Sequence, residues 1–274
     1  MSDSDSEGEE RVINWEMLAM TLPPETLAAM KEHFASKQTT VSTAVAPENS
    51  KQSLPNTVFS KREYWEERFE EEESYEWLVK FDDVKNLITS LLKPTDSILI
   101  VGCGNSSFSK DLYNSGFVNI VNIDYSSVLI EKMKVQHAED CPSMQWIHMD
   151  MTQLTFPKES FDVVIDKAAM DALMVDEGDV WYPSTDVIQS VDRMCRGVHD
   201  VLKPDGIFMQ ISFAQPHFRT KYLMGYHASG ATVNPYETHT GHSDVYNWNL
   251  TSQSIDIEEG CLNSFFYVAT KSRT

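Results

Sequence analysis

From residue 98 onward, short apolar runs alternate with segments in which apolar residues recur every three or four positions. The run Ile98–Val101 has the length and composition of a strand buried in a parallel sheet. Further strands are predicted at residues 118–123, 144–148, 161–165, 207–213 and 265–269. Helices are predicted at residues 81–92, 106–115, 128–137 and 186–201. This alternation indicates right-handed βαβ units, and therefore an α/β fold with a mostly parallel sheet and helices on both faces.

The last two predicted strands, residues 207–213 and 265–269, are separated by a long loop instead of a helix. A long loop does not provide the helical crossover that usually joins parallel neighbours. We therefore expect this pair to form an antiparallel edge of the sheet.

The first 57 residues differ in composition from the rest of the chain. They are predicted to be an extension that precedes a domain of residues 58–274. Residues 1–10 are acidic, and a short helix is predicted within residues 12–37. Residues 38–57 are rich in Ser, Thr, Ala, Asn and Pro, a composition typical of a linker. The short helix could dock on its own domain or bind another protein.

Two glycines, Gly102 and Gly104, directly follow the first predicted strand. Glycine at this position lets the backbone pass close to a ligand, where any Cβ would clash. Asp124 stands at the end of the next strand, 20 residues after Gly104. In a doubly wound sheet, a carboxylate at this place meets the ribose hydroxyls of a bound nucleoside. The spacing therefore predicts a nucleoside site.

The residues around this predicted site narrow the choice of nucleoside. A dinucleotide fingerprint needs a third glycine, but Ser107 occupies that position, and no Walker lysine follows. Asp150 ends the third strand, where an acid can accept a hydrogen bond from an adenine amino group, and Asp166 and Lys167 end the fourth. This set of strand-end residues fits S-adenosylmethionine better than a nicotinamide dinucleotide.

Several longer strings accompany these residues: Glu63-Tyr-Trp65, Tyr75-Glu-Trp77, Val101-Gly-Cys-Gly-Asn-Ser106, Ile123-Asp-Tyr-Ser-Ser127, Asp166-Lys167 through Asp171-Ala-Leu173, and Pro216-His-Phe-Arg-Thr220. With them the chain resembles the seven-strand S-adenosylmethionine-dependent methyltransferases, and within these a eukaryotic lysine methyltransferase group. That group includes the elongation factor 1-alpha lysine methyltransferases, the methyltransferase-like 13 proteins and the citrate-synthase lysine methyltransferase. The resemblance covers residues 60 to 223, continues weakly to the end, and does not extend to residues 1–57.

The resemblance implies a Rossmann-like seven-strand sheet and a reaction in which S-adenosylmethionine methylates a lysine of another protein. Elongation factor 1-alpha is the first expectation for that protein. A small-molecule methyltransferase on the same sheet and a non-catalytic binding module on the cofactor fold remain alternatives. The preserved glycines and acids argue against the binding module, because a scaffold has no need of a ribose-binding carboxylate.

The resemblance also implies which residues bind the cofactor from the N-terminal side. Trp65, Phe69 and Trp77 match aromatic or neighbouring positions that close over the cofactor, and relatives often carry Tyr where Phe69 stands. Gly102 matches the glycine beside the methionine part of the cofactor, and Gly104 belongs to the same loop. Trp65 and Trp77 could instead be ordinary core aromatics.

The remaining cofactor residues implied by the resemblance lie at the ends of strands. Asp124 matches the ribose ligand and Tyr125 its neighbour against the adenine. Asp150 and Met151 match the adenine pair, and Lys167 matches the residue after the fourth strand. Structural alternatives are that Asp124 is a strand-end cap and that Lys167 is solvated or paired with a carboxylate such as Asp166.

On the acceptor side, roles remain open. Asp171 could cap a helix or line the catalytic pocket, and no residue is identified as a catalytic base. His217 and Arg219 could form a structural turn, and no acid/base work is assigned to them. Residues 168–170 read Ala-Ala-Met where relatives usually carry Gly-Thr-Leu, which alters the wall between cofactor and substrate. Residues 224–262, which help to shape the acceptor side in the family, are also poorly matched.

The charge changes the picture of possible partners. The 274 residues include 22 basic and 42 acidic side chains, for a formal net charge of −20. Nucleic acids and anionic membranes are therefore disfavoured, because both need a basic surface. Many acidic residues lie within residues 63–76, where they suit a lysine-bearing substrate, although the run 70–73 is also explained as a solvated face. The oligomeric state stays open.

Four cysteines occur, Cys103, Cys141, Cys195 and Cys261, and no two of them form a C-x-x-C pair. We interpret them as reduced intracellular thiols, and the spacing of Cys and His predicts no metal site. No apolar run approaches the length of a membrane span, and the acidic N-terminus is unlike a mitochondrial transit peptide. A cytoplasmic location, with the nucleus as a second compartment, is expected.

Overall fold

The computed structural model describes residues 56–179, 182–229, 239–255 and 263–273. The chain divides into two compact units, Met1–Pro55 and Asn56–Thr274. The first unit lies outside the described residues, so the acidic tail and the short helix predicted there stay predictions. The second unit begins with a short 3-10 helix, η1 (Asn56–Ser60).

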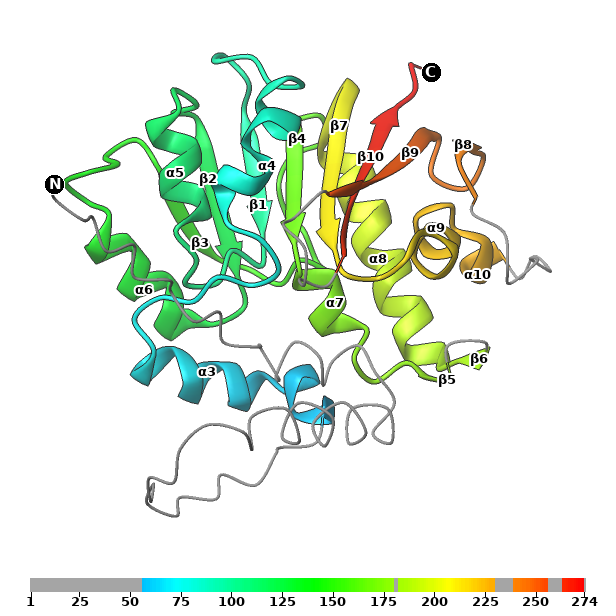
Figure 1. The fold of residues 1–274 in the computed structure, drawn as a ribbon, viewed down its shortest axis with the longest axis horizontal. Coiled ribbons are helices and arrows are strands. Elements are labelled where there is room, and N and C mark those ends of the chain that lie inside the picture. Colours follow the sequence, from blue (N-terminus) through cyan, green and yellow to red (C-terminus); the bar gives the residue numbers. More distant parts are fainter. Residues whose placement is uncertain (1–55, 180–181, 230–238, 256–262, 274) are drawn as a thin grey trace, which may run out of the picture. The chain divides into compact units, whose positions relative to one another are not determined.

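The second unit is built on an eight-stranded sheet with the order β3-β2-β1-β4-β7-β10-β9-β8 (Figure 1). Its first five strands are mutually parallel: β3 (Gln145–His148), β2 (Ile120–Asp124), β1 (Ile98–Val101), β4 (Phe161–Lys167) and β7 (Leu202–Ser212). In the register, Ile98 lies beside Ile120 on one side and Val163 on the other. All five carboxyl ends therefore meet at one edge, as the predicted βαβ units require.

The other end of the sheet corrects one prediction. β10 (Ser264–Lys271) pairs antiparallel with β7, as expected, but it is not an edge strand. β9 (Trp248–Ile255) pairs with its other side, and β8 (Gly241–Ser243) follows β9. The apolar pattern of the sequence does not predict β9, because this strand buries Trp248 and Leu250 on one face and exposes polar residues on the other. It therefore lacks the continuous apolar run by which the buried parallel strands were found.

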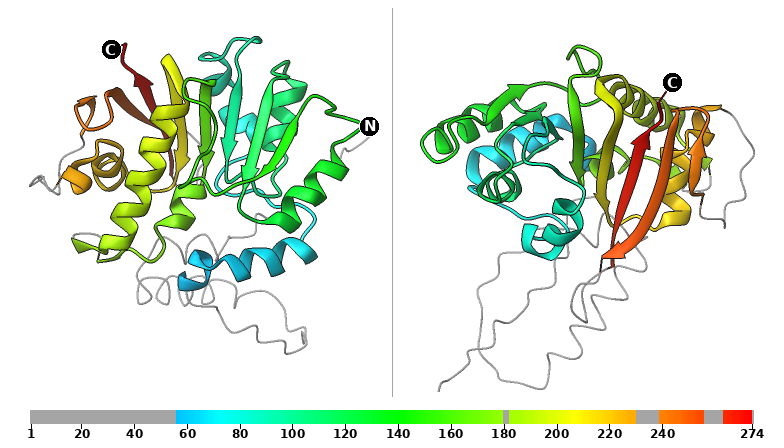
Figure 2. Two further views of the ribbon diagram at one scale, coloured as in Figure 1. Left: turned by 180° about the vertical axis from the view of Figure 1, so that it is seen from behind. Right: turned by 90° about the horizontal axis from the view of Figure 1, so that it is seen from above.

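Helices cover both faces of the sheet, as predicted (Figure 2). They are α3 (Arg62–Glu71), α4 (Phe81–Thr89), α5 (Phe108–Asn114), α6 (Ser127–Gln136), α7 (Ala169–Leu173), α8 (Thr185–Val201), α9 (Pro216–Leu223) and α10 (Tyr226–Ser229). Two residues of β1 show the division: Ile98 packs in the core with α4 and α5, whereas Leu99 packs in the core with α7 and α8. Alternate side chains of a strand point to opposite faces, which produces these two cores.

The carboxyl ends of the parallel strands carry two further elements, α3 and α7 (Figure 1). A small hairpin of β5 (Gly178–Asp179) and β6 (Tyr182–Pro183) follows α7 and precedes α8. Open α/β sheets bind ligands in the crevice outside the carboxyl ends of their strands. The strand-end residues singled out in the sequence are all at this edge.

Candidate functional site

The loop after β1 is shaped by two glycines in the left-handed backbone region. Gly102 has φ +58° and Gly104 has φ +55°, a conformation that side chains with a Cβ rarely adopt. A Cβ at Gly102 would stand 2.4 Å from the Cβ of Ala169 and 3.8 Å from Sδ of Met151. The loop after β1, the start of α7 and the segment after β3 therefore converge on Gly102.

Asp124 ends β2 beside this loop, and its carboxylate is buried. One oxygen, Oδ2, accepts a hydrogen bond from the backbone of Gly104 at 3.1 Å, and Oδ1 accepts one from Ser126 at 3.0 Å. Burial raises the pKa of Asp124 to about 6, and the hydrogen bonds from Ser126 and Gly104 oppose this rise. The carboxylate thus organises the turn after its strand and faces the glycine loop.

The residues predicted to surround an adenine lie at the ends of β2 and β3. The backbone N–H of Met149 donates to the carbonyl of Asp124 at 2.9 Å, which holds the two strand ends together. Asp150 is exposed and accepts two hydrogen bonds from Thr152, at 2.7 and 2.8 Å. The guanidinium carbon of Arg62 lies over the ring of Tyr125, 5.8 Å from the ring centre.

The predicted aromatic cover forms a cluster. The ring centre of Trp65 lies 5.6 Å from that of Phe69 and 5.7 Å from that of Trp77. Trp65 and Phe69 are buried, and Trp65 donates from Nε1 to the carbonyl of Phe59 at 2.8 Å. Trp77 is only half-buried, and Arg68 stacks 5.0 Å from its ring centre. Of the two tryptophans for which a core role was the alternative, Trp65 is buried and Trp77 is only partly buried.

Polar links attach α3 and the turn after it to the strand-end loops. Glu66 accepts a hydrogen bond from the Ser126 hydroxyl at 2.6 Å, at the start of α6. Lys132 donates to the carbonyl of Glu72 at 2.7 Å, and Asn105 donates to the Glu72 carboxylate at 2.9 Å. Glu72 therefore points toward the loop after β1, while Glu70, Glu71 and Glu73 are exposed. The solvated-face interpretation of this run holds for those three and fails for Glu72.

Glu76 is a site residue that the sequence analysis did not assign. Its carboxylate accepts hydrogen bonds from the Ser107 backbone at 2.5 Å and the Ser106 hydroxyl at 2.9 Å. It also pairs with Lys167 Nζ at 3.1 Å, and Lys167 donates to the carbonyl of Trp77 at 3.0 Å. The only signal in the sequence is its place between Tyr75 and Trp77 in a family motif.

Lys167 is almost completely buried, and its partner is Glu76 instead of the Asp166 considered above. Burial lowers the pKa of Lys167, and the charge of Glu76 opposes that effect. Asp166 is committed elsewhere: it accepts hydrogen bonds from the backbone of Ala169 at 2.8 Å and from the Gln210 amide at 2.7 Å. Burial raises the pKa of Asp166 to about 6.

The departure at residues 168–170 has a structural consequence. Ala168 is the N-cap of α7 and has φ +67°, a left-handed conformation that favours glycine. The alanine therefore carries backbone strain at this position. Ala169 places its Cβ against Gly102, so the loop after β1 and the start of α7 make an apolar contact.

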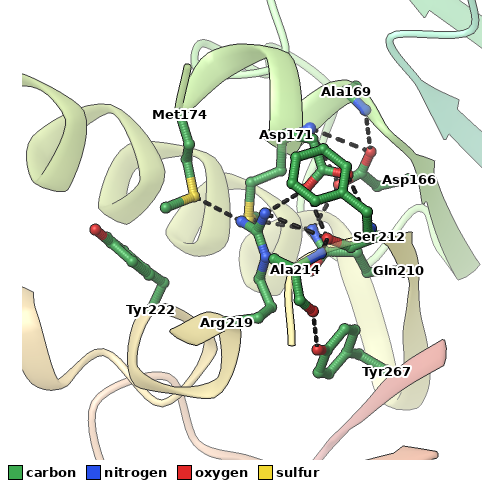
Figure 3. Close-up of polar contacts among 12 residues, drawn as sticks. Asp166, Ala169, Asp171, Met174, Gln210, Ser212, Ala214, Arg219, Tyr222 and Tyr267 are labelled. Carbon is green, nitrogen blue, oxygen red and sulfur yellow. Dashed lines mark hydrogen bonds and ion pairs between the residues drawn. The ribbon is translucent and has the colours of Figure 1, made fainter. Parts of the chain in front are cut away.

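On the acceptor side, the structure changes two expectations. Asp171 lies inside α7 and does not cap it, and it forms a buried ion pair with Arg219 (Figure 3). His217 and Arg219 belong to helix α9 and not to a turn. Pro216 begins this helix, at a position where a proline ring is tolerated. The sequence motif that carries them was recognised, but its conformation was not.

The comparisons with known proteins identify the family of the chain. A family model described as a methyltransferase domain matches residues 99–210. The EEF1A lysine methyltransferase 4 of Bos taurus is 37% identical over 175 residues, which are 63% of this chain and 68% of that protein. The chain belongs to the EEF1A lysine methyltransferase group of S-adenosylmethionine-dependent methyltransferases.

Other known proteins are similar to this methyltransferase over different shares of their length. The mouse EEF1A lysine methyltransferase 4 is 37% identical over 192 residues, 69% of this chain and 72% of that protein. The human eEF1A lysine and N-terminal methyltransferase is 35% identical over 189 residues, 68% of this chain but 26% of that longer protein. The solved N-methyltransferase NodS from Bradyrhizobium japonicum, in complex with S-adenosyl-L-homocysteine, has a TM-score of 0.50 at 14% identity. That likeness covers 77% of this chain and 98% of NodS, and it supports the fold alone.

Membrane-spanning helices, metal-binding clusters and free thiols were considered for the described residues. Within the described ranges, no helix has the length and apolar character needed to cross a membrane. In the same part of the chain, no three or more His, Cys, Asp and Glu side chains gather as a metal site would require. Cys103, Cys141 and Cys195 are buried free thiols, and Cys261 lies outside the described residues.

Proposed function

We propose that this methyltransferase transfers the methyl group of S-adenosylmethionine to a lysine side chain of elongation factor 1-alpha. The observation that carries the proposal is the buried Asp124 carboxylate beside the glycine loop. It stands in a chain 37% identical to proteins named EEF1A lysine methyltransferase 4. The relatives' names support the acceptor, and the strand-end geometry supports the nucleoside part of the cofactor.

The residues present fit S-adenosylmethionine. A Cβ at Gly102 would collide with Ala169, so only glycine lets the loop after β1 approach α7 this closely, and its backbone forms the proposed cradle for the cofactor. Asp124 has two carboxylate oxygens that can accept from the two ribose hydroxyls. Asn105 Oδ1 is buried and has no hydrogen-bond partner among the described residues, which leaves one acceptor available in this loop.

The other predicted contacts follow from the same placement. We assign Tyr125, Asp150 and Met151 to the adenine, and Gly102, Gly104 and Lys167 to the methionine part. Trp65, Phe69 and Trp77 form the cover over the cofactor. When bound, the cofactor supplies an electrophilic methyl group, so the chain itself has to position an amine and exclude water.

The acceptor lysine has to reach this site without its proton. A free lysine has a pKa near 10.4, and desolvation in an apolar site lowers it because the charged form is disfavoured. The exposed carboxylates of Glu63, Glu67, Glu70 and Glu71 occupy α3, which covers the carboxyl ends of the strands. Their charge draws a basic protein segment toward the crevice.

We also propose that the protein works in the cytoplasm, with the nucleus as a second compartment, and that it does not act on nucleic acid. The net charge of −20 disfavours nucleic acid, because binding it requires a basic surface. A fluorescent fusion of the full chain tests the compartment, and a location in the mitochondria would contradict it.

The experiment for the activity uses the full chain, methyl-labelled S-adenosylmethionine and purified elongation factor 1-alpha. We expect label on one or a few lysines, located by mass spectrometry, and no label with Asp124→Ala. In a parallel incubation with cell extract, label confined to the small-molecule fraction would favour a small-molecule methyltransferase. Failure of the wild-type chain to bind S-adenosylhomocysteine in calorimetry would favour a non-catalytic module.

A further inference from the structure

The ion pair of Asp171 and Arg219 lies between two elements that are far apart in the sequence (Figure 3). Asp171 belongs to α7, which follows β4, and Arg219 belongs to α9, which follows β7. Each side chain is only 2% exposed, so the charges are removed from water. Burial raises the pKa of Asp171, and the Arg219 guanidinium opposes that rise.

Asp171 directs its contacts to the segment after β7. Besides Arg219, it accepts a hydrogen bond from the Ser212 hydroxyl at 2.6 Å and a longer one from the Phe213 backbone at 3.4 Å. Ser212 in turn accepts from the backbone of Ala214 at 3.0 Å. On the opposite side, Tyr267 of β10 donates to the Ala214 carbonyl at 2.5 Å. Residues 213–215 are therefore held from both sides.

The strand order indicates what this segment faces. Asp124 ends β2, and the order β2-β1-β4-β7 places residues 213–215 two strands beyond the glycine loop. The nucleoside part of the cofactor belongs over β1 and β2, where Asp124 and Gly102 lie. The crevice over β4 and β7 is therefore left for the methyl acceptor.

α7 connects the two parts of this crevice. Its residue Ala169 stands against Gly102, and its residue Asp171 holds the segment after β7. The amide of Gln210 in β7 donates to Asp166 at 2.7 Å, directly before α7. A displacement of α7 would therefore move the loop at Gly102 and residues 213–215 relative to each other.

A stability role alone explains this arrangement poorly. Apolar residues of similar size often serve a core as well as a buried ion pair or better, because desolvating two charges is expensive. The network also leaves two buried polar atoms, Arg219 Nε and Gln210 Oε1, without a partner among the described residues. Such incomplete networks are costly, and they occur where function requires a fixed geometry.

We propose that the Asp171–Arg219 pair is a positioning device for the methyl acceptor. It fixes the wall formed by residues 213–215 against α7, so that the acceptor amine approaches the cradle at Gly102 along one direction. Neither residue contacts the cofactor. This inference rests on the proposed methyltransferase function and adds the residues that set the acceptor geometry.

The test uses the full chain with two variants of the pair. The double variant Asp171→Asn/Arg219→Gln removes both charges and leaves neither unpaired. Arg219→Lys keeps the charge but loses the guanidinium, whose Nη2 donates to both Asp171 and Ser212. For the double variant we expect kcat toward the protein acceptor to fall at least about tenfold, because small misplacements of reacting atoms cost large factors in rate. The Kd for S-adenosylhomocysteine should stay within about threefold of wild type, and Arg219→Lys should recover part of kcat.

The matched control is the exposed pair of Asp205 and Arg273, which also joins an aspartate to an arginine. Asp205→Asn/Arg273→Gln should change neither kcat nor the Kd. All variants are assayed at a temperature at which circular dichroism shows them folded. A normal kcat for the folded double variant would overturn the proposal, and so would a Kd that rises in parallel with the loss of rate.

These outcomes are separable from a failure of the proposed function. If wild-type enzyme binds S-adenosylhomocysteine but methylates no protein, the proposed function is wrong. The positioning role is then wrong as well, because there is no protein acceptor to position. If wild-type enzyme methylates its acceptor and the double variant does so equally well, only the positioning role is wrong. Hydrogen exchange at the Phe213 and Ala214 amides provides a readout that needs no acceptor. Unchanged protection of these amides in the double variant would contradict the proposed wall.

Discussion

The backbone N–H of Gly104 donates a hydrogen bond of 3.1 Å to the carboxylate of Asp124. The contact joins the loop after β1 to the end of β2, so the glycine loop and the proposed ribose ligand are held as one unit. Asp124 accepts a second bond from Ser126, and burial raises its pKa to about 6. The carboxylate is therefore oriented before a ligand arrives.

The first prediction concerns Asp124 itself. Asp124→Ala removes both carboxylate oxygens, and we expect the affinity for S-adenosylhomocysteine to fall about 10- to 100-fold. Hydrogen bonds to a charged group contribute about 1.5–3 kcal/mol, and a factor of ten corresponds to about 1.4 kcal/mol. Isothermal titration calorimetry measures the change. Asp140→Ala, which removes an exposed carboxylate paired with Lys110, is the control and should leave the affinity unchanged.

The second prediction concerns the pH dependence of cofactor binding. Because burial raises the pKa of Asp124 to about 6, the carboxylate is mostly ionised at pH 7 and mostly protonated at pH 5. Protonation removes its ability to accept from both hydroxyls, so binding weakens as the pH falls through this pKa. One proton per site weakens the affinity by about tenfold between pH 7 and pH 5. An affinity that is equal at the two pH values would show that ionised Asp124 is not required.

The third prediction concerns Glu76 as the connection between the aromatic cover and the strand-end loops. Glu76→Gln removes the charge that pairs with Lys167 and leaves that ammonium buried without its carboxylate. We expect a loss of about 2 kcal/mol in the free energy of unfolding, since hydrogen bonds to charged groups contribute on this scale. Residues 62–77 should also exchange their amide hydrogens faster, because the hydrogen bond from Ser107 loses its charged acceptor and weakens.

The control for Glu76 is Glu73→Gln, which changes an exposed carboxylate in the same segment. It should alter neither the stability nor the exchange of residues 62–77. Equal effects of the two variants would mean that the charge of the segment matters and that the contact with Lys167 does not.

The fourth prediction concerns the left-handed backbone of Ala168. Ala168→Gly relieves the strain at φ +67°, and we expect a gain of about 1 kcal/mol in the free energy of unfolding. For a domain of this size, that gain raises the Tm by about 2–4 °C. Differential scanning calorimetry is the measurement. Ala172→Gly, inside α7, should lose a similar amount because glycine is unfavourable in a helix interior. A loss in both variants would show that the left-handed position carries no strain.

The sequence by itself determined the features that depend on short stretches of chain. β1 could be predicted because four consecutive apolar residues, followed directly by glycine, are typical of a strand buried on both faces. The cradle and its carboxylate were visible because Gly102, Gly104 and Asp124 directly follow strands, and the carboxyl ends of parallel strands meet at one edge. Family motifs added the aromatic residues and the segment that carries His217 and Arg219, although not the helical conformation of that segment. The predictions for residues 1–55 lie outside the described residues and remain predictions.

Only the tertiary structure decided which distant side chains meet. Glu76 and Lys167 are 91 positions apart, and Asp171 and Arg219 are 48 apart. β10 lies inside the sheet because β9, whose pattern is half polar, pairs with its free side. Local periodicity reports which face of an element is buried, but it carries no information about the element that covers it. The partner of a buried charge is decided by strand order and helix packing, and these are properties of the whole fold.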